Sequence, residues 1–189
     1  KKYNLKFLSS GLLYRYASYL IIKHKPKKEV SFLRLEFKKL NLDNLKKLDL
    51  HTSKISEHSS IIAKKKKIRE ILKNFQLTFS KKNKNCCIEG RDISTKILPQ
   101  SNLKFFFKCA LNKAALRRYK ELKKKDKKIT LDQVKNALRI RNIKDTKRKH
   151  SPLLRHRNSI VIDTGKLSKL AMLAKMSKHV EKVLKEYEK

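Results

Sequence analysis

Hydrophobic residues recur along the chain in two patterns, short apolar runs and longer segments with helical spacing. The runs at residues 3–8, 85–89, 103–109 and 159–163 predict strands. Apolar side chains spaced three or four apart predict helices over 12–24, 61–79, 111–125 and 131–148, and a further helix after residue 165. Because strands and helices alternate, the pattern predicts a doubly wound α/β fold with a parallel sheet and helices on both faces.

The run at 103–109, LKFFFKC, is apolar at nearly every position. Such a run is typical of a strand that helices cover on both sides, which supports a central parallel sheet. In folds of this kind ligands bind at the carboxyl ends of the strands. Gly90, Arg91 and Asp92 directly follow the strand at 85–89, so we expect a binding site there.

Residues 25–60 interrupt this alternation. The segment is polar, contains short leucine-rich pieces and has Pro26 near its start as a breaker. It is therefore predicted to be a small insert in the core.

The charge is strongly positive, with 52 Lys and Arg against 16 Asp and Glu, a net charge of +36 and a pI near 10.3. This balance is typical of proteins that bind nucleic acid or another polyanion. The lysines, however, are spread over the whole chain, in runs such as 64–67 and 123–125, which indicates a general bias of composition. Because the planar arginine fork grips phosphate or carboxylate at two points, the few arginines are the better candidates for a site.

No apolar run reaches the length of a membrane span, and the three cysteines lack the spacing of metal ligands. We expect a soluble, cytoplasmic monomer that has no membrane contact and no metal ligands of its own.

Arg141, Asp145 and Arg148 lie at positions i, i+4 and i+7 of a predicted helix and so share a face. Two interpretations stay open. The face is either a solvated salt-bridge face or an anion clamp in which the carboxylate orients two guanidinium groups.

Four motifs follow one another along the chain: SGLLYR at 10–15, GRD at 90–92 with Pro99, RRYKEL at 117–122 and RNIKDTKRKHSPL at 141–153. In this order and spacing, residues 3–163 resemble the bacterial cytidylate kinase family, the (d)CMP kinases of the nucleoside monophosphate kinase superfamily. The resemblance implies a P-loop kinase-type fold with core segments at 1–24, 61–116 and 153–189, a nucleotide-binding insert at 25–60 and a lid region at 117–152.

The resemblance also implies roles for individual residues. Ser10, Arg69, Asp92 and Arg148 match positions that recognise CMP, mainly its base. Arg15 and Arg91 match positions that face its phosphate, and Ser60, Arg141 and Asp145 match positions that touch the sugar. Arg117 and Arg118, in the lid, and Arg148 are the candidate catalytic residues, acting by positioning and charge neutralisation with Mg²⁺ on the donor ATP.

The chain departs from the family pattern in one large respect. No G-x-x-x-x-G-K motif is present, because the only glycines are Gly11, Gly90 and Gly165. That motif cradles the donor phosphates, so the residues that bind ATP are unknown. We interpret the chain as lacking the first, P-loop strand and helix of the family, and expect it to be inactive without them.

The leading functional hypothesis is transfer of the γ-phosphate of ATP to CMP or dCMP. Two alternatives stay open: a basic protein that binds RNA or the ribosome, and a paralogue that binds nucleotide without catalysis. The absence of aromatic stacking motifs argues against the RNA-binding alternative.

Overall fold

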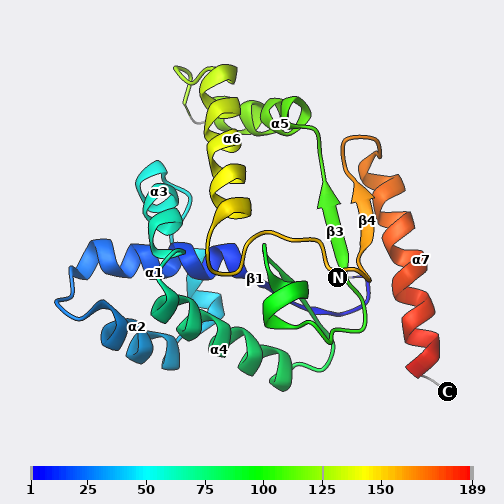
Figure 1. Cartoon of the computed structure of the whole chain (residues 1–189), viewed down its shortest axis with the longest axis horizontal. Coiled ribbons are helices and arrows are strands. Elements are labelled where there is room, and N and C mark those ends of the chain that lie inside the picture. The colour runs from blue at the N-terminus through cyan, green and yellow to red at the C-terminus, as the bar shows by residue number, and fades with distance from the viewer. Residues whose placement is uncertain (1, 125, 188–189) are drawn as a thin grey trace. The chain divides into compact units, whose positions relative to one another are not determined.

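The computed structural model describes residues 2–124 and 126–187. The chain forms two compact units (Figure 1). The first comprises residues 1–97 and 148–152, and the second comprises residues 98–147 and 153–189.

The first unit begins with a short strand that leads directly into a helix. Its elements, in chain order, are β1 (Lys6–Ser9), α1 (Ser10–His24), α2 (Glu29–Lys38), the 3-10 helix η1 (Leu42–Lys47), α3 (Ser53–Ile62), α4 (Lys66–Lys82), β2 (Cys86–Glu89) and the π-helical turn η2 (Ile93–Ile97). β1 pairs with β2 in parallel, with Ser9 opposite Glu89. Both strands therefore end at the same edge.

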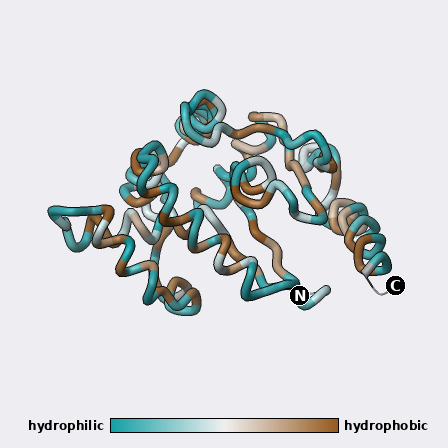
Figure 2. The backbone as a smooth tube through the Cα atoms, turned by 60° about the horizontal axis from the view of Figure 1, so that its bottom comes forward, coloured by the Kyte–Doolittle hydropathy of each residue, from teal (hydrophilic) through white to brown (hydrophobic). Residues whose placement is uncertain are grey.

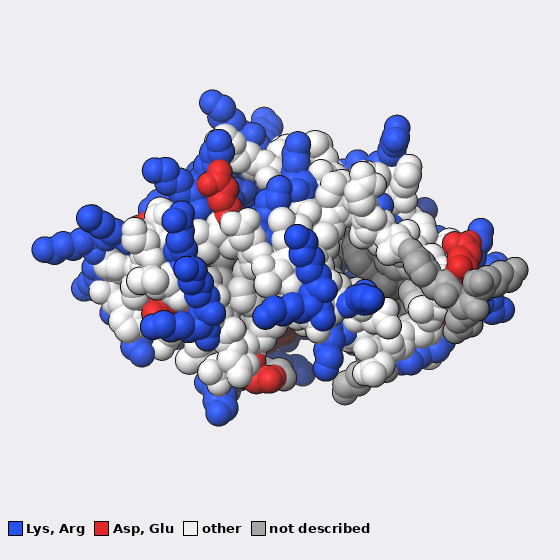
Figure 3. Space-filling view, turned by 90° about the horizontal axis from the view of Figure 1, so that it is seen from below, with Lys and Arg blue, Asp and Glu red and all other residues white. Residues whose placement is uncertain are grey.

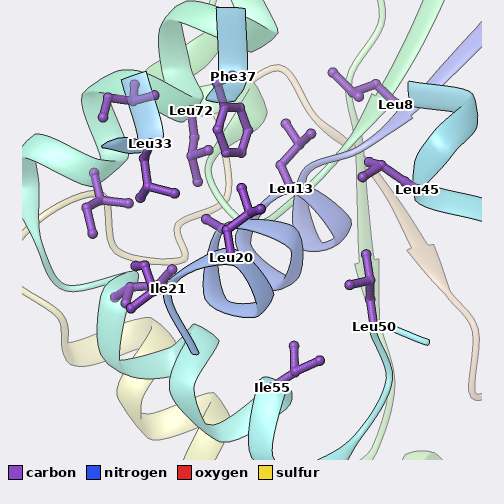
Figure 4. Packing of buried hydrophobic residues seen from close by; sticks show 14 residues of the cluster. Leu8, Leu13, Leu20, Ile21, Leu33, Phe37, Leu45, Leu50, Ile55 and Leu72 are labelled. Atoms are coloured by element: carbon purple, nitrogen blue, oxygen red, sulfur yellow. The ribbon is translucent and has the colours of Figure 1, made fainter. Parts of the chain in front are cut away.

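Helix α1 lies at the centre of the first unit. Leu13 and Leu20 of α1 meet Leu33 and Phe37 of α2 and Leu72 of α4 (Figure 4). All five side chains are at most 5% exposed. Residues 25–60, expected to be an insert, thus contribute α2, η1 and α3 to the same core as α1.

The single helix predicted at 61–79 is in fact two. Helix α3 ends at Ile62 and α4 begins at Lys66. Four consecutive lysines, at 64–67, span this break. Like charges within one or two helical turns repel each other, which disfavours a continuous helix here.

The second unit consists of β3 (Phe105–Lys108), α5 (Leu111–Lys123), α6 (Leu131–Lys147), β4 (Ile160–Asp163) and α7 (Lys169–Tyr187). β3 pairs with β4 in parallel, and α5 packs against α6. The Phe105 and His179 rings, 6.3 Å apart between centroids, join β3 to α7.

The two units differ in how much apolar surface they bury. Among the described residues of the second unit, only Ala115, Val134 and Ile162 are buried hydrophobics, and Phe107 is 50% exposed. The expectation that the run at 103–109 is covered on both faces is therefore wrong for Phe107. In Figure 2 hydrophobic and hydrophilic stretches alternate along the helices of both units.

The predicted fold class is correct in outline, since the molecule mixes helices with parallel strands. The prediction of one sheet is not met. The described strands form two separate two-stranded sheets, because β1 pairs only with β2 and β3 only with β4.

Lysine and arginine side chains are spread over the whole face shown in Figure 3, and acidic side chains are few. This spread agrees with a general bias toward lysine in the sequence. Within the described ranges, every helix is too short or too polar to cross a membrane.

Shortening a core leucine tests the packing around α1. Leu72 is fully buried, so Leu72→Ala should lower the free energy of unfolding by about 2–5 kcal/mol, through lost burial and the cavity left behind. Leu35 of α2 is 57% exposed, so Leu35→Ala is the matched control. This substitution should change the free energy of unfolding by less than about 0.5 kcal/mol. Urea denaturation followed by circular dichroism measures both, and equal losses would contradict the described core.

Candidate functional site

Four buried polar side chains of the first unit form two pairs near the ends of β1 and β2, Arg69 with Asp92 and Ser10 with Gln76. Ser18 is also buried but lies about two turns further along α1. Because a buried polar group is costly unless it is hydrogen-bonded, such a group of pairs marks a candidate site.

The ends of the two strands are joined by side chains. Ser9 Oγ donates to Glu89 Oε1 at 3.1 Å and accepts from Leu12 N at 3.3 Å, which caps α1. Ser10 is the first residue of α1, and Gly90, Arg91 and Asp92 follow β2. The parallel register therefore brings the SG and GRD motifs to one edge, as ligand sites in parallel sheets require.

Arg69, in the first turn of α4, has three partners. Its Nη2 lies 2.5 Å from Asp92 Oδ2 and its Nη1 donates to the Ala63 carbonyl at 3.1 Å. Its guanidinium carbon lies 5.6 Å from the centroid of the Tyr14 ring, a cation–π contact. The guanidinium group is thus held from three directions and its orientation is fixed.

Asp92 is 4% exposed and is fixed through both its backbone and its side chain. Its carbonyl oxygen accepts from the backbone N–H groups of Thr95, Lys96 and Ile97 at 2.9–3.3 Å. Its Oδ1 lies 4.0 Å from Nη2 of Arg148. The carboxylate therefore sits between two guanidinium groups.

Arg148 does not lie on the helical face predicted for it. Helix α6 ends at Lys147, and residues 148–152 belong to the first unit. Arg148 Nε donates to the Ser151 carbonyl at 2.5 Å, and Ser151 has a positive φ of 52°. The chain turns sharply here, so Arg148 contacts Asp92 instead of extending the Arg141–Asp145 face.

Other predicted residues of the first unit lie on α1, on α3 and directly after β2. Arg15 donates from Nη1 to His51 Nδ1 at 2.7 Å. Because a guanidinium group can only donate, this hydrogen bond requires His51 Nδ1 to act as the acceptor. Ser60 Oγ donates to the Ser56 carbonyl within α3 at 3.3 Å, and Arg91 is half-buried beside Asp92.

The remaining predicted residues belong to the second unit. Arg117 donates to the Thr164 carbonyl at 2.6 Å, and Arg118 pairs with Glu121 at 2.7 Å. Arg141 and Asp145 are 3.9 Å apart along α6, with Arg141 46% exposed. That pair is a helical i, i+4 ion pair.

Three residues around the site were missed by sequence reasoning: Tyr14, His51 and Gln76. Gln76 follows Arg69 by seven residues, which places both on one face of α4, two turns apart. A glutamine among the apolar residues that recur at helical spacing was a signal in the sequence. The contacts of Tyr14 and His51 depend on tertiary packing, so no local pattern in the sequence indicated them.

Among residues 2–124 and 126–187, no three His, Cys, Asp or Glu side chains group closely enough to hold a metal ion. The groups gathered at the site are the guanidinium groups of Arg69 and Arg148, the Asp92 carboxylate, the Ser10 hydroxyl and the Gln76 amide.

Known proteins match almost the whole chain. The family model described as "Cytidylate kinase" matches residues 1–182. The protein named "Cytidylate kinase" from Rickettsia canadensis (strain McKiel) is 31% identical over 182 residues, which cover 96% of this chain and 83% of that protein. A protein of the same name from Fusobacterium nucleatum subsp. nucleatum is 33% identical over 194 residues, covering 97% and 88%.

Parallel strands that end at a cluster of arginines, together with these matches, define a kinase, an enzyme of the phosphotransferase class. The chain belongs to the cytidylate kinase family.

Adding a methyl group at Gly90 tests whether the strand ends must approach closely. A Cβ at Gly90 would lie 2.8 Å from Ile93 Cγ1 and 3.0 Å from Ser10 Cβ, so Ile93 must shift and Ser10 must give way slightly. We expect Gly90→Ala to weaken nucleotide binding about tenfold or more, the scale of one lost polar contact.

Gly11→Ala is the matched control, because the nearest atom would be 3.9 Å away and alanine favours the helix. It should leave binding unchanged. Calorimetric titration of both variants with nucleoside monophosphates measures the difference in affinity. Binding by Gly90→Ala as tight as that of the unchanged chain would contradict the close packing of Gly90 against Ser10 and Ile93.

The ionisation of Tyr14 offers a pH test of the site. Burial raises the pKa of Tyr14 from 10.0 to about 12, with a further rise from Asp92 that Arg69 and Arg148 oppose. The folded state therefore keeps this proton between pH 10 and 12 whereas the unfolded chain loses it, so stability falls as the pH rises through that window. Ultraviolet titration of tyrosinate should show a late step that Tyr14→Phe removes, and a Tyr14 step near pH 10 would contradict it.

Proposed function

We propose that the first unit binds CMP or dCMP and presents it as the acceptor of the γ-phosphate of ATP. The observation that carries this proposal is the buried cluster of Arg69, Asp92 and Arg148 beside Ser10 at the ends of β1 and β2. The names of the relatives support the same substrate.

Asp92 is proposed to read the base. An ionised carboxylate only accepts hydrogen bonds, and Arg69 and Arg148 hold the Asp92 carboxylate in place. Cytosine carries an amino group that donates, whereas uracil has a carbonyl oxygen at the same place. A carboxylate fixed at this point would therefore favour cytosine and repel uracil.

Arg15 and Arg91 are proposed to hold the acceptor phosphate. Arg15 extends from α1 and Arg91 follows β2, so both flank the same strand ends. A phosphate monoester offers several charged oxygens to guanidinium forks, whereas the His51 ring that Arg15 contacts offers a single nitrogen. On phosphate binding, Arg15 would thus leave His51 and bind the phosphate instead.

The second unit is proposed to supply the lid. Arg117 and Arg118 of α5 would neutralise charge on the transferred phosphoryl group, and Arg148 would contribute from the acceptor side. Ser60, Arg141 and Asp145 are proposed contacts of the sugar. Arg117 would first have to leave the Thr164 carbonyl that it contacts in this structure.

Donor binding is a separate requirement. Phosphoryl transfer needs a cradle for the phosphates of Mg²⁺–ATP, and the 189 residues contain no G-x-x-x-x-G-K motif. We propose that the fold is a P-loop kinase-type sheet without its first strand and helix. Two observations support this proposal: parallel sheets of only two strands are rarely stable, and Phe7 and Phe107 on strands are at least half exposed.

The proposed substrate can be tested by binding alone. We expect calorimetric titration of the 189-residue chain to show CMP binding at least about tenfold tighter than UMP or AMP binding, since each mismatched polar contact costs about 1–3 kcal/mol. Asp92→Asn should remove most of the preference for CMP, while Asp126→Asn, an exposed change, should not. Equal affinity for the three nucleotides would refute the proposal.

Catalysis needs a second measurement on the same chain. Preceded by a strand, a G-x-x-x-x-G-K loop and a helix, the chain should release ADP only when CMP or dCMP is present. Selective binding without ADP release would favour a non-catalytic nucleotide-binding role. RNA binding that persists at moderate salt, without CMP binding, would favour the RNA-binding alternative.

A further inference from the structure

Gln76 is a buried polar residue that no proposed contact with the nucleotide requires. It lies on α4 and is only 2% exposed. Its Nε2 donates to Ser10 Oγ at 2.5 Å, across 66 residues of sequence. Glutamine is seldom fully buried, and the hydrogen bond to Ser10 offsets the cost of its burial.

This hydrogen bond sets the direction in which Ser10 can bond to anything else. A serine hydroxyl has one proton to donate and two lone pairs to accept with. Because the Gln76 amide donates to Ser10, the Ser10 hydroxyl keeps its own proton for a different partner. Ser10 is therefore biased to act as a donor.

A donor at Ser10 complements the acceptor at Asp92. Both residues lie at the ends of β1 and β2, since a Cβ added at Gly90 would lie 3.0 Å from Ser10 Cβ and Asp92 follows Gly90 by two residues. Cytosine presents an amino donor next to a ring nitrogen that accepts, whereas uracil presents a carbonyl acceptor next to an N–H that donates. A donor beside an acceptor thus matches cytosine and mismatches uracil.

We propose that Gln76 is a positioning residue for base selection, which fixes the Ser10 hydroxyl as a donor toward the ring acceptor of cytosine without touching the nucleotide. The inference rests on the proposed function, because it assumes that the acceptor is a cytosine nucleotide. Arg69 and Gln76 would then play parallel parts, one holding the acceptor Asp92 and the other the donor Ser10.

The test compares two variants at position 76 with the same changes on the solvent face of α4. Gln76→Met keeps the side-chain volume and removes the hydrogen bond, and Gln76→Glu keeps the shape but, when ionised, accepts instead of donating. Asn74→Met and Asn74→Asp are the controls, because Asn74 is exposed on the same helix. Calorimetric titration of the full chain with CMP and with UMP measures each affinity, and circular dichroism checks folding.

Both Gln76 variants should lower the ratio of CMP to UMP affinity about tenfold, and both Asn74 variants should leave it unchanged. In a Ser10→Ala background the Gln76→Met change should have little further effect, because the two residues act as one unit. If one position-76 variant does not fold, the other carries the comparison.

The outcomes separate the two proposals. A wild-type chain that binds CMP no better than UMP overturns the proposed function and with it this inference. A wild-type chain that prefers CMP, together with Gln76 variants that are less stable but keep the full preference, overturns the role of Gln76 alone. Additive losses from Ser10→Ala and Gln76→Met also contradict it.

Discussion

The buried ion pair between Arg69 and Asp92 is the interaction on which the architecture of the site depends. Both side chains are at most 8% exposed, so each would carry a large desolvation cost without the other. The pair joins the start of α4 to the turn after β2, and the Ala63 carbonyl and the Tyr14 ring bring in the end of α3 and helix α1. Buried ion pairs add little net stability compared with apolar residues of the same size. The Arg69–Asp92 pair therefore acts mainly by fixing the positions of the two charged groups.

Helix α4 carries two kinds of buried side chain, and this explains how a small unit holds a polar site. Ile68, Ile71 and Leu72 pack into the core around α1. Arg69 and Gln76, two turns apart, reach Asp92 and Ser10 at the ends of the two strands. Any displacement of α4 would therefore disturb the core and both halves of the candidate site together.

The sequence predicted the elements of the site better than its connections. The strand ends, the GRD turn and the helix bearing Arg117 lie within a few residues of their predicted positions, because each depends on local spacing and turn residues. The contacts of Gln76 with Ser10 and of Arg15 with His51 cross 66 and 36 residues, and no local pattern specifies them. Helical spacing placed Arg148 on the Arg141–Asp145 face, but α6 ends at Lys147 and the chain turns at Ser151. The family resemblance, by contrast, had grouped Arg148 with Asp92, which it contacts.

Bulk charge and specific charge have separate roles in this molecule. The net charge of +36 comes mainly from lysines spread over the surface, which attract any polyanion and distinguish none. Arg69 and Arg148, by contrast, have side chains at most 9% exposed and surround one carboxylate. A lysine in place of Arg69 could not contact Asp92 and the Ala63 carbonyl with a planar fork, nor stack on Tyr14 in the same way. Selectivity therefore has to arise from the few buried polar groups, whose geometry the lysine-rich surface leaves unchanged.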